Sequence, residues 1–173
     1  MTPEEKARAK IDAMLNASGW VVQTKDKINL SAARGVAICE LSFATGEPDY
    51  TLFVDGKALG TVEAKPEGHS LIGVEEQSTK YVVGVPAGLP AWHSPLPFCY
   101  ESTGSETRFT NRLDPEPRSR NVFAFHCPEK LLDCDRQRGA RHPPPPYHPL
   151  KSIYRPTGMN VASNKISQTG SDL

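Results

Sequence analysis

Residues 48–65 read PDYTLFVDGKALGTVEAK, and this stretch decides the fold. Apolar and polar residues alternate on both sides of Asp55-Gly56-Lys57. An Asp-Gly step between two alternating runs is typical of a β-hairpin, because both residues tolerate the positive φ that a tight turn needs. We therefore predict two antiparallel strands, at 49–54 and 59–65, joined by this turn.

The register of this hairpin determines which side chains meet. If the loop has three residues, Val54 faces Ala58 and Asp49 falls directly opposite Glu63, whereas a two-residue loop shifts the pairing by one. In the first register the Cβ atoms of Asp49 and Glu63 lie about 5 Å apart on one solvated face. Lys65, two residues beyond Glu63, points to the same face. The opposite face is apolar and buried, and carries Tyr50, Leu52, Val54, Val62 and Ala64.

The three polar residues of this face suit metal-dependent cleavage of a phosphodiester bond. Two carboxylates that repel each other are tolerated when a cation bridges them, and Mg²⁺ takes oxygen ligands. Such a cation lowers the pKa of a bound water, while a lysine helps to place the water and offsets developing charge. We predict that Asp49, Glu63 and Lys65 are catalytic and that the two carboxylates bind Mg²⁺.

An E-x-K triplet has little specificity alone, since about one is expected by chance in a chain of this length. Glu4-Glu5-Lys6 and Asp55-Gly56-Lys57 also match, but the first lies at a predicted helix start and the second forms the turn. The third match gains weight from Pro48-Asp49 upstream. It also gains weight from Gln77 and Tyr81 downstream, which form Q-x-x-x-Y on one face of a predicted helix.

Each of these residues also has an ordinary structural explanation. Asp49 and Glu63 would form a solvated polar face. Taken alone, Gln77 is typical of a solvent-exposed side chain and Tyr81 of a core residue. Glu40 precedes the site on its own predicted strand, and it is either an accessory metal ligand or a surface charge.

The elements around the hairpin predict an α/β domain with a mixed central sheet flanked by helices. Thr2-Pro3-Glu4-Glu5 has the pattern of a capping box, so a helix begins there, and Gly19 is a typical helix stop. Ser70–Val83 fits a second helix. The further predicted strands are Trp20–Gln23, Val36–Phe43, Phe98–Ser102, Thr107–Thr110 and Val122–Phe125.

The composition indicates one globular domain. A chain of 173 residues is long enough for one core with tails, and its formal net charge is zero, so any nucleic-acid surface must be a local patch. No apolar run reaches the roughly 20 residues of a membrane span, and the N-terminus lacks the layout of a signal peptide. We therefore expect a cytoplasmic protein without a membrane partner.

The composition changes near the C-terminus. Residues 142–146 read HPPPP, and the Ser- and Asn-rich end shows no apolar periodicity. Such a segment has little to bury and favours disorder. We therefore expect the folded domain at 1–132 and a Pro-rich tail, disordered or frameshifted, at 133–173.

These motifs resemble the N-terminal nuclease domain of the R (restriction) subunit of type I restriction–modification enzymes. That domain belongs to the PD-(D/E)xK superfamily and carries a Q-x-x-x-Y motif. The stretches that carry the resemblance are 48–57 (PDYTLFVDGK), 62–66 (VEAKP), 76–81 (EQSTKY), 97–111 (PFCYESTGSETRFTN) and 114–120 (DPEPRSR). With the residues around them they cover about Thr2 to Glu129.

The resemblance implies a restriction-endonuclease-like PD-(D/E)xK core that cuts foreign, unmodified double-stranded DNA with Mg²⁺. It implies that Asp49, Glu63 and the backbone carbonyl of Ala64 bind the metal. It further implies that Gln77 and Tyr81 contact DNA or organise the site. The modification and specificity subunits would be partners of the chain, and a separate subunit would read the DNA sequence.

The chain departs from this family in one respect. R subunits continue into an ATP-driven motor, but the sequence contains no G-x-x-x-x-G-K-[S/T] motif. We therefore expect an R-subunit nuclease domain, truncated before the motor and without ATP binding of its own. Two alternatives stay open: a non-catalytic remnant that binds DNA or other subunits, and a stand-alone repair-type nuclease of the same fold.

Overall fold

The predicted hairpin forms at the centre of the sheet, as β3 (Tyr50–Val54) and β4 (Lys57–Ala64). Its turn has two residues, Asp55 and Gly56, with φ of 50° and 76°. Both residues are therefore in the left-handed region, as in the tight turns that match the twist of paired strands. The three-residue loop considered from the sequence does not form.

A bulge close to the turn changes the register again. Phe53 faces Ala58, but its neighbour Leu52 faces Gly60, so Leu59 is an extra residue on β4. A Cβ placed on Gly60 would lie only 2.8 Å from the carbonyl oxygen of the neighbouring strand, so glycine permits the close approach there. Beyond the bulge, the pairing is the one that a three-residue loop would have produced.

The computed structural model describes residues 2–71 and 84–141, which belong to the unit Met1–Pro143. Pro144–Leu173 form a second unit, which lies outside the described residues. Most of the helix predicted at Ser70–Val83 lies outside them too.

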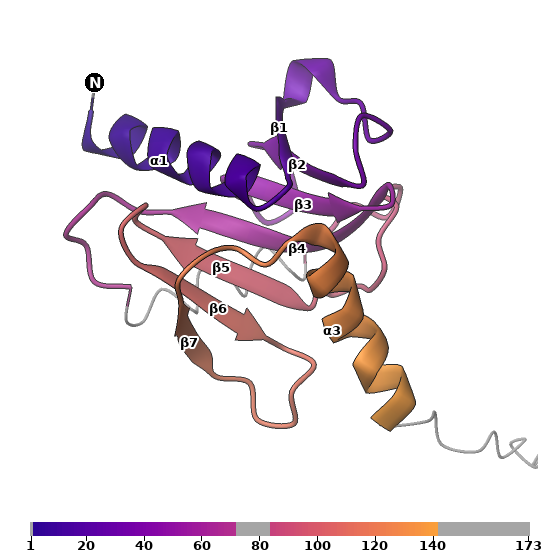
Figure 1. The fold of residues 1–173 in the computed structure, drawn as a ribbon. Coiled ribbons are helices and arrows are strands. Elements are labelled where there is room, and N and C mark those ends of the chain that lie inside the picture. Colours follow the sequence, from indigo (N-terminus) through magenta and orange to yellow (C-terminus); the bar gives the residue numbers. More distant parts are fainter. Residues whose placement is uncertain (1, 72–83, 142–173) are drawn as a thin grey trace, which may run out of the picture. The chain divides into compact units, whose positions relative to one another are not determined.

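A mixed sheet is built around the hairpin. The flanking strands are β1 (Val21–Thr24), β2 (Gly35–Cys39), β5 (Phe98–Ser102), β6 (Thr107–Asn111) and β7 (Ser119–Val122). Within the described residues, seven strands lie side by side in chain order (Figure 1). β1 is parallel to β2 and β4 to β5, whereas the other neighbours are antiparallel. The predicted α/β class with a mixed sheet is confirmed.

The first helix, α1 (Pro3–Ala17), begins as the sequence predicts. Thr2 is the N-cap, and its reciprocal bonds with Glu5 complete the capping box. Gly19, with φ of 89°, follows the end of the helix. The apolar stripe of this helix is buried, and consists of Ala7, Ile11 and Leu15.

A second helix, α3 (Pro128–Arg141), crosses the domain boundary predicted at residue 132. Leu131 and Leu132 are buried, and Cys134 packs against the same cluster. The apolar stripe of this helix is too short to stand out from the polar residues beside it, so the sequence pattern did not predict the helix. Neither helix in the described ranges is long and apolar enough to cross a membrane.

Both faces of the hairpin are covered. α1 and α3 lie on one face of the sheet (Figure 1), over a cluster that includes Ile11, Leu15, Trp20, Tyr50, Leu52, Val62, Tyr100 and Leu131. The other face contributes a second buried cluster, with Val36, Ile38, Phe43, Phe53, Ala58, Leu96 and Cys99. The solvated face expected beside the predicted site is therefore largely buried.

Two predicted strands end at different residues. β2 ends at Cys39 rather than Phe43, because Glu40 has a positive φ of 51° and turns the chain out of the sheet. Glu40 therefore does not lie on a strand as predicted. The last strand lies at Ser119–Val122 rather than at Val122–Phe125, because Phe125 packs into the core from the segment before α3.

Candidate active site

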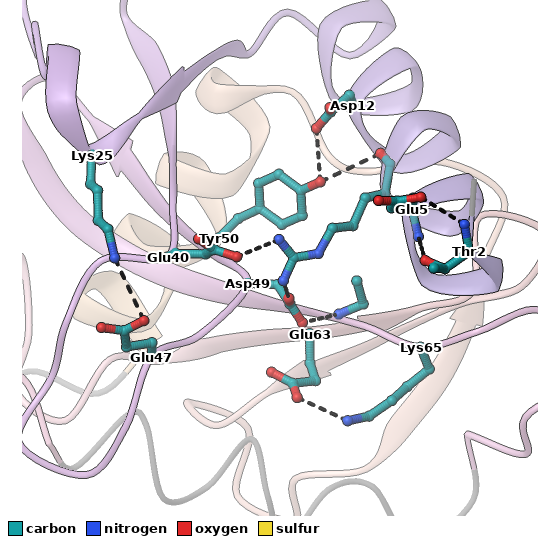
Figure 2. Close-up of polar contacts among 12 residues, drawn as sticks. Thr2, Glu5, Asp12, Lys25, Glu40, Glu47, Asp49, Tyr50, Glu63 and Lys65 are labelled. Carbon is teal, nitrogen blue, oxygen red and sulfur yellow. Dashed lines mark hydrogen bonds and ion pairs between the residues drawn. The ribbon is translucent and has the colours of Figure 1, made fainter.

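A pocket of about 240 Å³ lies where the N-terminal half of α1 meets the end of β4. Its lining residues are Glu4, Arg8, Asp49, Glu63, Ala64 and Lys65. The structure thus brings together the three residues predicted as catalytic and the residue whose backbone carbonyl was expected to bind metal. Figure 2 shows the carboxylate of Glu63 and the amine of Lys65 side by side at this end of the hairpin.

Asp49 is fixed at the end of the hairpin by backbone groups. Tyr50 faces Val62 in the ladder, so the next pair in this register is Asp49 and Glu63. The Oδ2 atom of Asp49 accepts a hydrogen bond from the backbone N–H of Ala64 at 2.7 Å. The carbonyl of Asp49 accepts another from Glu40 at 3.1 Å. These bonds hold the Asp49 carboxylate beside the strand that carries Glu63.

Glu63 and Lys65 form an ion pair that is mostly shielded from water. The Nζ atom of Lys65 donates to Oε1 of Glu63 at 2.9 Å, and the two side chains are 21% and 10% exposed. The other oxygen of Glu63, Oε2, is buried and has no hydrogen-bond partner. Burial raises the pKa of Glu63 above its ordinary value, and the charge of Asp49 adds to this, while Lys65 acts in the opposite direction.

Arg8 joins the site from α1, and the sequence analysis did not identify it. Its guanidinium bonds Oδ1 of Asp49 through Nη2, and Oε1 of Glu40 at 2.6 Å through Nη1. Burial alone would lower the pKa of Arg8, but the bond to Glu40 and the charges of Asp49 and Glu40 raise it above its ordinary value. No sequence motif separates Arg8 from an ordinary surface arginine, since it lies beside the buried stripe of an amphipathic helix.

The remaining predicted residues divide into two groups. Glu40 does not line the pocket, and its side chain is bonded to Arg8. This bond lowers the pKa of Glu40. Gln77 and Tyr81 lie outside the described residues, so their roles stay predictions.

The donor atoms of the pocket fit a hard divalent cation. Asp49 and Glu63 supply carboxylate oxygens, and Oε2 of Glu63 is a buried acceptor without a partner. Within residues 2–71 and 84–141, no group of three or more His, Cys, Asp or Glu side chains is arranged to hold a metal. A cation here would take carboxylate oxygens from Asp49 and Glu63 and complete its shell with water, as Mg²⁺ commonly does.

The mixed sheet and this end-of-strand pocket define an α/β domain that is consistent with a restriction-endonuclease-like fold. Among solved structures, the chain is similar to a fragment described as "a putative HsdR subunit of a type I restriction enzyme from Vibrio vulnificus YJ016". The TM-score is 0.59 at 18% sequence identity, over 81% of this chain and 26% of that one. The likeness shows the fold, and the chain spans about a quarter of the matched chain. No curated protein matches the sequence.

The family described as "Type I restriction enzyme R protein N terminus" matches residues 26–118, more than half of the chain. The chain therefore belongs to this family, as the resemblance of its motifs predicts. The match includes Asp49, Glu63 and Lys65, but it begins after α1, so Arg8 lies before the matched residues.

Proposed function

We propose that this chain is the Mg²⁺-dependent DNA endonuclease domain of a type I restriction R subunit. The observation that carries the proposal is the pocket at the end of β4, where Asp49, Glu63 and Lys65 lie together. The family to which the chain belongs supports it. Double-stranded DNA is the proposed substrate, and the modification and specificity subunits are the proposed partners, in the cytoplasm.

Each side chain has a distinct proposed task. Asp49, anchored by the Ala64 N–H, and Glu63, with a buried oxygen to share, would hold Mg²⁺ together with the Ala64 carbonyl. When bound, Mg²⁺ supplies a water of lowered pKa and a positive charge at the phosphate. The ammonium of Lys65 orients Glu63 and stabilises negative charge in the transition state. Gln77 and Tyr81 are proposed to contact DNA or to organise the site. No use of ATP is proposed for this chain.

Cleavage of closed circular DNA by the purified chain tests this function. We expect Mg²⁺-dependent nicking that a chelator abolishes. No cleavage of any DNA, together with retained DNA binding, would instead indicate a non-catalytic binding remnant. Degradation of linear DNA with closed circles left intact would indicate an exonuclease of the repair type.

A further inference from the structure

Arg8 occupies the carboxylate that the proposed function assigns to the metal. Its Nη2 bonds Oδ1 of Asp49, and the second oxygen of Asp49 already accepts the N–H of Ala64. Both oxygens of Asp49 are therefore engaged by donors from the chain itself. A divalent cation that binds Asp49 must displace one of these donors or share an oxygen with it, and the guanidinium is the donor whose positive charge opposes the cation.

The charges explain why an arginine lies there. Asp49 and Glu63 both line the pocket, and the charge of Asp49 helps to raise the pKa of Glu63. A planar guanidinium can bond two carboxylates at once, which a lysine ammonium does with less geometric precision. Arg8 bridges Asp49 and Glu40. In the metal-free protein its positive charge therefore offsets the repulsion between Asp49 and Glu63, as a bound cation would.

Glu40 gives the guanidinium a second anchor. Arg8 and Glu40 are 38% and 45% exposed, whereas Asp49 is 14% exposed. If Arg8 leaves Asp49, it keeps Glu40 as a partner at the solvent-facing side of the site. The departure of Arg8 therefore does not strand an unpaired charge in a buried position.

We propose that Arg8 is an internal competitor of the metal: it binds Asp49 in the metal-free protein and releases it when the cation enters. This rests on the proposed function, which makes Asp49 a metal ligand. The apparent dissociation constant of the metal is then the intrinsic one divided by the fraction of molecules in which Arg8 has released Asp49. Arg8 is a positioning residue in this account.

Titration calorimetry of Mg²⁺ binding to the full chain tests the proposal. Arg8→Gln should bind Mg²⁺ about tenfold more tightly than wild type, a change equivalent to about 1.4 kcal/mol. Lys10→Gln is the matched control, because Lys10 lies on the same helix, pairs with Glu67 and does not line the pocket. If Arg8→Gln does not fold, as judged by circular dichroism, Arg8→Lys replaces it, with tighter binding again expected.

The outcomes separate this proposal from the function on which it rests. Unchanged or weaker Mg²⁺ binding by Arg8→Gln, with wild-type binding that Asp49→Asn abolishes, would overturn the Arg8 proposal and leave the metal site intact. An equal increase in the Mg²⁺ affinity of Lys10→Gln would also overturn it, because the loss of any positive charge would then explain the effect. Absence of Mg²⁺ binding in wild type and Arg8→Gln alike would overturn both.

Discussion

At the scale of single residues, the buried carboxyl of Glu63 links the candidate site to the stability of the fold. A carboxyl whose folded pKa is raised destabilises the fold when ionised, since the charged form is the one that burial penalises. The stability that the fold gains from keeping Glu63 protonated is complete below the ordinary pKa of 4.5. It is lost as the pH rises through the raised pKa.

We predict that Glu63→Gln is more stable than wild type at pH 7–8 without metal. The stability difference should shrink as the pH falls toward 4.5, because wild-type Glu63 then becomes protonated. Urea unfolding at a series of pH values measures this. A difference in unfolding free energy that stays constant over the whole range would show that Glu63 is not held with a raised pKa.

A second prediction concerns Lys65. Lys65→Ala should lower the nicking rate about 10²–10³-fold, the usual effect of removing one electrostatic stabiliser. Because Lys65 is bonded to a largely buried Glu63, the variant should also lose stability at neutral pH and recover it at low pH. The exposed Lys25→Ala serves as the control for charge. A wild-type nicking rate in Lys65→Ala would exclude Lys65 from catalysis.

The sequence was informative about residues whose spacing reflects the period of a strand. Asp49, Glu63 and Lys65 could be selected because alternation and turn position place them together. Arg8 could not, since its role depends on how α1 docks against β4, a contact between segments about 50 residues apart. The expected solvent exposure of this face was wrong because segments outside the hairpin cover it.

At the scale of elements, the hairpin has the register predicted for Asp49 and Glu63, but not the loop from which that register was predicted. Two loop lengths were compatible with the residues of the turn, and only the longer one set Asp49 opposite Glu63. The structure has the shorter loop and restores the register with a bulge at Leu59. Bulges leave a weak signal in sequence, and here only Gly60 marks the place.

Gly60→Ala tests the importance of that bulge. The added Cβ would lie 2.8 Å from the carbonyl oxygen and 3.0 Å from the Cβ of Phe98, and the backbone of β5 cannot yield freely. We expect a loss of about 1–3 kcal/mol in unfolding free energy, as for other overpacked sites. Gly88→Ala, which meets nothing within 4 Å, is the control. Equal stability of both variants would contradict the close packing of β4 on β5.

At the scale of the whole molecule, the amino-acid composition alone excluded few classes of protein. A net charge of zero gave no sign of a DNA-binding protein, and the family became visible only through spaced motifs. The mixed sheet was predicted from the order of strands and helices read from the sequence, and the structure confirms that the sheet is mixed. The C-terminal limit was harder to find, because α3 buries few large side chains in an otherwise polar sequence.

We predict that α3 is essential for the stability of the described domain. A chain ending at Pro143 keeps Leu131 and Leu132 in the core, whereas one ending at Cys127 removes both. Each buried leucine contributes about 2–5 kcal/mol, so the shorter chain should be largely unfolded at room temperature. Circular dichroism melts of the two chains compare them. Equal melting temperatures would show that the packing of α3 adds little.

The central claim is that Asp49 serves metal-dependent cleavage, and the most direct measurement compares plasmid nicking by three proteins in Mg²⁺. Asp55→Asn is the matched control for Asp49→Asn, since it removes the same charge from the exposed turn of the same hairpin. We predict that Asp49→Asn nicks at least about 10²-fold more slowly than wild type, while Asp55→Asn nicks at the wild-type rate. Equal nicking by wild type and Asp49→Asn, or nicking that a chelator does not affect, would contradict the account.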